Sequence, residues 1–211
     1  WLLKYVLQAR LNYPKDAVNK YWSMSFKEKV GRRIGYEWLP VHYHMSTGST
    51  GLPTPCVYTR RDLLGLLPVL SAAVFPRPDP PSPEEPYLGL DSRIMNVFPG
   101  VPHLAFFQTV FMKILLGASV FDTGGGKAIP TERQIEIFHR ARQNFVTAVP
   151  SYMIYWLRTA VQLKEEGRIG KMDHFHGVFL GGEAVSKAQR AYIKELAAAL
   201  GPHPRFRIIE T

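Results

Sequence analysis

From about residue 91 to its end, the chain alternates between short apolar runs and amphipathic segments. The short runs are rich in Val, Ile and Phe and predict strands at 92–98, 118–123, 145–149, 176–182 and 206–211. Apolar residues at helical spacing predict helices between them, at 103–116, 131–142, 151–167 and 186–201. Strands that are separated by helices pair in parallel, and helices cover both faces of such a sheet. The sequence therefore predicts an α/β fold with a mainly parallel sheet flanked by helices.

Residues with strong capping preferences mark the ends of these helices. Thr131 and Ser186 stand where N-caps are expected, and Gly167 and Gly201 stand where helices should end. Ligands of open parallel sheets bind beyond the carboxyl ends of the strands. The loops that follow the strands are therefore the places to search for chemistry.

The first part of the chain is less regular. Residues 1–38 read as helical pieces, and two β-like runs at 41–45 and 55–59 flank a polar loop. Residues 61–75 have helical spacing that Pro68 must interrupt, and a proline-rich surface excursion follows at 76–86. Because the chain opens inside an apolar stretch and stops directly after a predicted strand, the 211 residues are expected to be a fragment of a longer protein.

Composition narrows the classes of partner. The net charge of +9 favours anionic ligands, but the basic residues are scattered and form no arm or one-sided helix, so nucleic acid is not the expected partner. The single cysteine, Cys56, excludes an intrachain disulfide and is compatible with the cytoplasm. No apolar run approaches the ~20 residues that a membrane span requires.

The polar loop at residues 46–53 reads STGSTGLP. Gly48 and Gly51 allow a tight backbone, so successive N–H groups and the flanking hydroxyl groups can converge on a phosphate. It is not a Walker loop, because the required lysine is absent. By composition alone, an ordinary turn is the simpler interpretation.

Three further segments follow predicted strands. Residues 181–184 (GGEA) join a strand to a helix, which suits either a ligand-facing loop or a plain turn. Pro150 and Ser151 open a helix whose aromatic residues, Tyr152 among them, suit a pocket wall or the core equally. Residues 124–127 (GGGK) lack the rest of a phosphate motif and are interpreted as a flexible turn.

Taken in order, these motifs resemble the phenylacetate–CoA ligase branch of the adenylate-forming enzymes. The most specific part is STGSTGLPT at 46–54, followed by Tyr58, Thr59, Asp62 and Leu63. Thr54 is typical of this branch, where many other members have lysine. The resemblance extends from about Tyr13 to the last residue, and it implies that residues 1–211 are part of the N-terminal adenylation (AMP-binding) domain of such an enzyme.

The resemblance implies an ATP-dependent carboxylate–CoA ligase that acts on a small-molecule, aryl or aryl-acetic acid. An acyl-AMP forms first and a coenzyme A thioester second, with Mg²⁺ as the metal and a homodimer as a possible assembly. It implies that Gly181, Gly182, Glu183 and Ala184 lie against adenine and the acyl pocket, and that Tyr152 walls the acid. It implies a loop for the ATP phosphates formed by Ser46, Thr47, Gly48, Ser49, Thr50 and Gly51.

The catalytic groups that the family would supply are outside the 211 residues. The family's Y-G-x-T-E motif should follow the last predicted strand, and the catalytic lysine belongs to a C-terminal lid domain. The catalytic residues of this chain are therefore unknown. Two other interpretations stay open: adenylyl transfer to a deazaflavin-type cofactor by a related synthetase, and a non-catalytic nucleotide-binding or interaction module.

Overall fold

The computed structural model describes residues 37–45, 55–66, 91–100, 105–106, 109–110 and 117–210. The chain divides into two compact units, Trp1–Leu70 and Ser71–Thr211, and each is described by itself.

The first unit contains an antiparallel strand pair. Strand β1 (Pro40–Met45) pairs with β2 (Pro55–Thr59), so both strands predicted beside the polar loop are present. The short helix η1 (Asp62–Leu66) follows, and the Asp62 carboxylate accepts hydrogen bonds of 2.8 Å from the Thr59 amide and the Thr59 hydroxyl. The loop at 46–54, residues 1–36, most of the helix predicted at 61–75 and the proline-rich segment lie outside the described residues.

A five-stranded sheet organises the second unit, and its strand order is β4-β3-β5-β6-β7. Every neighbouring pair of strands is parallel. The five strands match the five predicted runs: β3 (Arg93–Asn96), β4 (Ser119–Asp122), β5 (Phe145–Ala148), β6 (Gly177–Leu180) and β7 (Arg207–Glu210). The predicted α/β fold with a parallel sheet is confirmed.

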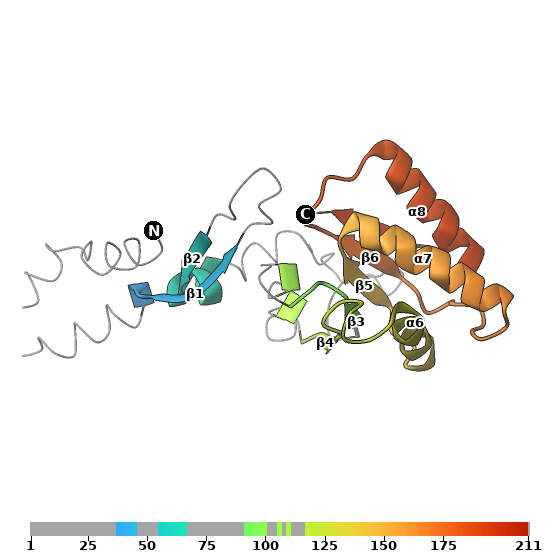
Figure 1. Cartoon of the computed structure of the whole chain (residues 1–211), viewed down its shortest axis with the longest axis horizontal. Coiled ribbons are helices and arrows are strands. Elements are labelled where there is room, and N and C mark those ends of the chain that lie inside the picture. Colours follow the sequence, from blue (N-terminus) through green and yellow to red (C-terminus); the bar gives the residue numbers. More distant parts are fainter. Residues whose placement is uncertain are drawn as a thin grey trace, which may run out of the picture. The chain divides into compact units, whose positions relative to one another are not determined.

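Three helices pack against one face of this sheet, as Figure 1 shows. They are α6 (Thr131–Arg140), α7 (Pro150–Glu165) and α8 (Lys187–Leu200). Their buried residues, such as Phe138, Trp156 and Ile193, form one core cluster with Met95 and Val146 of the strands. On the other face, Ile94, Phe145 and Phe179 form a second cluster, against which Ala105 and Phe106 pack. The two clusters follow from the alternation of side chains along each strand.

The order of the strands creates a switch point between β3 and β5. The chain leaves β3 toward β4 on one side, then crosses back to β5 and continues in the opposite direction to β6 and β7. Right-handed connections that run in opposite directions cover opposite faces of a sheet. The two core clusters are consistent with this rule, because residues 105–106 pack on one face of the sheet and α6, α7 and α8 pack on the other. A crevice for a ligand is expected where these connections separate.

The helix ends agree with the sequence at α8 and differ at α6. Ser186 caps α8 with a complete capping box that includes Gln189, and Gly201 ends the helix in the left-handed region at φ 67°. The cap predicted at Thr131 is wrong: the N-cap of α6 is Pro130, and Thr131 is the first helical residue. The Thr131 hydroxyl instead contacts the Tyr152 hydroxyl at 2.8 Å, so a tertiary contact replaces the local cap. No helix within the described ranges has the length and apolar character needed to span a bilayer.

Candidate functional site

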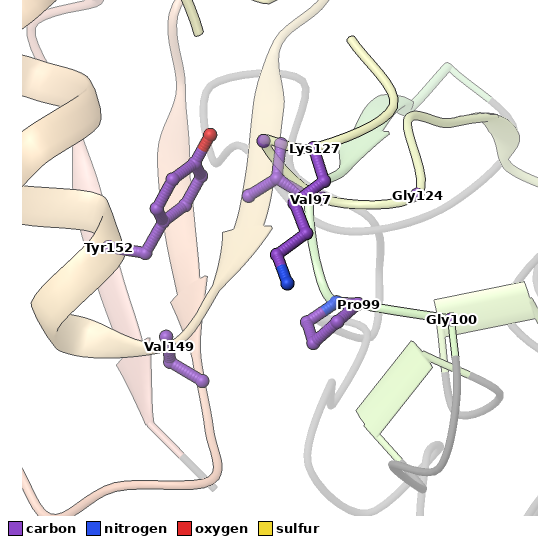
Figure 2. Close-up of a pocket in the computed structure, with 9 residues that line it drawn as sticks. Val97, Pro99, Gly100, Gly124, Lys127, Val149 and Tyr152 are labelled. Atoms are coloured by element: carbon purple, nitrogen blue, oxygen red, sulfur yellow. The ribbon is translucent and has the colours of Figure 1, made fainter. Parts of the chain in front are cut away.

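A pocket of about 640 Å³ lies at the carboxyl edge of the sheet, where the loops after β3, β4 and β5 meet. Figure 2 shows the residues around it. They are Val97, Pro99, Gly100, Gly124, Gly125, Gly126, Lys127, Val149 and Tyr152. This is the edge at the switch point, so the topology and the pocket indicate the same place.

The glycine loop after β4 forms one wall, and its shape needs glycine. Gly124 and Gly125 have φ angles of +70° and +80°, which side chains other than glycine rarely adopt. Gln134 of α6 fixes this loop from behind. Its buried amide nitrogen donates to the Gly125 carbonyl at 3.2 Å and to the Ile129 carbonyl at 2.8 Å, so the turn that carries Lys127 is held at both ends.

The ring of Tyr152 forms a second wall of the pocket, while its hydroxyl is engaged in hydrogen bonds with other residues. That hydroxyl donates to the Gln134 amide oxygen at 3.4 Å and lies 2.8 Å from the Thr131 hydroxyl, which then acts as the donor. The contact with the loop is close: a Cβ placed on Gly126 would lie 2.7 Å from the Tyr152 oxygen. The aromatic face is therefore the surface that Tyr152 offers to a ligand.

Lys127 is the one charged residue among those that line the pocket. Figure 2 shows its side chain extending from the glycine loop into the space bounded by Tyr152, Val149 and Pro99. The other lining side chains are apolar, apart from the Tyr152 hydroxyl described above. The pocket thus combines apolar walls with a single positive charge, which suits an organic anion.

The GGEA loop after β6 lies beside this pocket and is hydrogen-bonded to the first turn of α7. The Glu183 carboxylate accepts hydrogen bonds from the Ser151 amide at 3.1 Å and from the Ser151 hydroxyl at 2.9 Å. A carboxylate in this place satisfies one of the free N–H groups of the first turn of α7 and interacts favourably with the helix dipole. Gly182 has a φ angle of +81°. A Cβ added to it would lie 3.4 Å from Cγ1 of Val149, so this loop is in close contact with a residue that lines the pocket.

A buried polar network fixes the strand ends beneath the pocket. The Asn96 amide donates to Asp122 of β4 at 2.9 Å, and its carbonyl oxygen accepts from Thr147 of β5 at 3.0 Å. The Asn96 backbone carbonyl also accepts from the Thr123 hydroxyl at 3.0 Å. Because these groups satisfy one another, three neighbouring strands are held in register at the edge that carries the loops.

The structure brings together part of the predicted site. Tyr152 lines the pocket, and residues 181–184 lie next to it through the Glu183–Ser151 contact but are not among the lining residues. The predicted phosphate loop, Ser46–Gly51 in the sequence, lies outside the described residues. The turn expected at 124–127 is present, but its role as a pocket wall was missed, as were Val97, Pro99, Gly100 and Val149. Their position at or just beyond the carboxyl ends of predicted strands is the available signal.

A metal site is not visible within the described residues. No group of three or more His, Cys, Asp or Glu side chains there is arranged to hold an ion.

Comparison with known proteins supports the fold. No protein-family model matches the sequence, and no curated protein shows significant sequence similarity to it. Among solved structures, an open form of 2-hydroxyisobutyryl-CoA ligase in complex with 2-HIB-AMP and CoA matches with a TM-score of 0.59 at 15% identity. That match covers 80% of this chain and 32% of the ligase.

Two other structures give a similar result. A long-chain fatty-acid–CoA ligase from Archaeoglobus fulgidus matches with a TM-score of 0.56 at 21% identity, over 79% of this chain and 29% of the enzyme. A fatty acyl-adenylate ligase, from work on the E. coli and L. pneumophila enzymes, matches with a TM-score of 0.59 at 15% identity, over 81% and 29%. The chain thus spans about three tenths of the length of these proteins, and it has the α/β fold of their N-terminal domain.

Proposed function

We propose that this chain belongs to an adenylate-forming ligase that activates a carboxylic acid with ATP and transfers the acyl group to coenzyme A. The pocket at the switch point is the main support. It places apolar walls and one positive charge next to the loop that resembles the family's adenine loop. The neighbours, whose names include acyl-CoA ligases and a complex with an acyl-AMP and CoA, share the fold of this chain.

In this proposal the described residues bind and orient the acid. The ring of Tyr152 and the side chains of Val97 and Val149 pack against its apolar part. Gly181, Gly182, Glu183 and Ala184 hold the adenosine end, and the Glu183 carboxylate keeps that loop fastened to α7. Ser46, Thr47, Gly48, Ser49, Thr50 and Gly51 are assigned to the ATP phosphates on the resemblance alone.

The proposed reaction has two steps, adenylation of the acid and formation of the thioester. A carboxylate oxygen of the acid attacks the α-phosphorus of ATP, the new O–P bond forms, and the bond to pyrophosphate breaks. The sulfur of coenzyme A then attacks the acyl carbon, AMP leaves, and the thiol proton is released. Mg²⁺ would neutralise phosphate charge in the first step. The chain's part in both steps is to position the reactants, which can supply a large share of the rate.

We further propose, on the same resemblance, an aryl or aryl-acetic acid as the substrate, a cytoplasmic location and a homodimer. The apolar pocket walls are compatible with an aryl body, but they do not select one acid.

The experiment that tests this proposal is acid-dependent exchange of labelled pyrophosphate into ATP. It should be run on the full-length parent protein with a panel of aryl and alkyl acids, each with and without coenzyme A. Exchange with at least one acid, and a thioester product when coenzyme A is added, are expected. A folded protein that gives no exchange with any acid contradicts the proposal. Adenylylation of a hydroxyl acceptor without thioester would instead indicate the deazaflavin-type synthetase.

A further inference from the structure

Lys127 is placed where it can recognise a second group on the acid, apart from the carboxylate that reacts. This inference rests on the proposed function and concerns the same pocket. Among the described residues that line the pocket there is no carboxylate to pair with Lys127, and the Tyr152 hydroxyl is used by Thr131 and Gln134. The ammonium group therefore supplies the pocket's one side-chain charge.

The backbone of Lys127 is fixed, so its placement is a property of the fold. Gln134 holds the Gly125 carbonyl on one side of Lys127 and the Ile129 carbonyl on the other. The glycine loop also contacts the next loop, since a Cβ on Gly125 would lie 3.6 Å from the Cα of Pro99. A lysine on a turn held at both ends loses less freedom when it binds a ligand than one on a free loop.

The strand order separates Lys127 from the nucleotide end of the site. Lys127 follows β4, while the loop assigned to adenosine follows β6, and the order β4-β3-β5-β6 puts two strands between them. Three steps of about 4.8 Å place the ends of β4 and β6, from which the two loops start, roughly 14 Å apart across the sheet. Lys127 reaches into the pocket from the β4 side, opposite Val149 and the Tyr152 ring (Figure 2). An acid bound with its reacting carboxylate near the loop after β6 would therefore extend its far end toward Lys127.

We propose that Lys127 is a specificity-determining residue that selects acids carrying a second anionic group at the end opposite to the reacting carboxylate. An aryl or chain dicarboxylate has this chemistry: the middle is apolar, one carboxylate reacts, and the other pairs with the ammonium group. The pairing is a charge-assisted contact in a concave site with apolar walls, where it is stronger than on an open surface.

The test compares matched acids on the 211-residue chain. Dissociation constants of 4-carboxyphenylacetate, 4-carbamoylphenylacetate and phenylacetate are measured by ligand-observed NMR for the wild type, Lys127→Met and Lys194→Met. Lys194 is an exposed lysine of α8 outside the pocket and serves as the matched control. The wild type should bind the dicarboxylate about tenfold more tightly than phenylacetate, as expected for one charge-assisted contact. The carbamoyl compound should lie between them.

The Lys127→Met variant should bind the dicarboxylate and phenylacetate with equal affinity, whereas Lys194→Met should keep the wild-type preference. Equal affinities in the wild type, a preference that survives Lys127→Met, or no binding of any of the three acids would overturn the inference. Pyrophosphate exchange decides the proposed function separately. Exchange that shows no preference for dicarboxylates refutes the role of Lys127 and leaves the ligase activity standing.

Discussion

At the scale of single residues, a few buried contacts determine the shape of the pocket. Gln134 uses both sides of its amide, donating to two loop carbonyls and accepting from the Tyr152 hydroxyl. Gly126 leaves room for that hydroxyl. A polar group that is buried and fully bonded is costly to disturb, because breaking one contact leaves its partners unsatisfied. The pocket wall and the helix behind it therefore behave as one unit.

Replacing Gly126 with alanine should destabilise the second unit by about 1–3 kcal/mol, as overpacking commonly does. The new Cβ would lie 2.7 Å from the Tyr152 oxygen, so either the ring or the loop must move. Urea unfolding of the two proteins measures the difference. Gly170→Ala is the matched control, because its Cβ meets only His139 atoms at 3.8 Å, an ordinary contact. Adding Tyr152→Phe removes the close atom and should recover part of the loss; a fully additive pair would show that the contact is not the cause.

His174 should make the protein less stable in acid. Burial lowers the pKa of His174 to about 4, with further lowering from Arg142 and His139 that exceeds the opposing effect of Asp173. Below the ordinary pKa of 6.5 the unfolded chain binds a proton that the folded chain refuses, until the pH falls to about 4. The free energy of unfolding should therefore decrease through this window, by at most about 1.4 kcal/mol per pH unit for one histidine.

The measurement for His174 is urea unfolding at several pH values between 4 and 7, with His174→Phe as the comparison. His176 contributes in the same direction, since burial, His203 and Arg93 lower its pKa to about 4 as well. The variant should thus keep part of the slope and lose the share of His174. A slope equal to that of the wild type would show that His174 does not titrate on unfolding.

At the scale of helices and strands, the sequence predicted what local chemistry determines and missed what tertiary contacts determine. Ser186 and Gly201 were correctly placed at the ends of α8, because capping depends on neighbouring residues. Thr131 was misplaced, because its hydroxyl contacts Tyr152, twenty-one positions later. The local pattern of the GGGK segment predicts only a flexible turn, since nothing in that pattern shows that Gln134 holds the segment at the wall of a pocket.

Glu183 links two elements, and its loss should loosen both. Replacing it with alanine removes the acceptor for the Ser151 amide and hydroxyl, so the first turn of α7 and the loop at 181–184 should open more often. Faster amide hydrogen exchange is expected at 151–153 and 181–184, with a stability loss of about 0.5 kcal/mol, typical of an exposed helix-end charge. Glu195→Ala, in an exposed position on α8, should change neither. Unchanged exchange at Ser151 would contradict the proposed link.

At the scale of the whole molecule, the pocket and the predicted phosphate loop fall in different units. Every lining residue lies between Val97 and Tyr152, within Ser71–Thr211, whereas residues 46–51 belong to Trp1–Leu70. The second unit also contains both buried clusters of the parallel sheet. If each unit supplies one part of a shared reaction, binding of the acid and binding of the phosphates are separable properties.

A protein comprising residues 71–211 should therefore fold alone and keep the acid pocket, but lose phosphate binding. The reason is that its sheet, helices and lining residues are complete without the first unit, as far as the described residues extend. Circular dichroism and a cooperative urea transition test its folding. Ligand-observed NMR should then give the 71–211 protein the same affinity for phenylacetate as the 211-residue chain, within about twofold.

Pyrophosphate should bind the longer chain only, and the substitution of both Gly48 and Gly51 by valine in that chain should abolish this binding. An unfolded 71–211 protein, or one that binds pyrophosphate as well as the longer chain does, would refute the separation of the two sites.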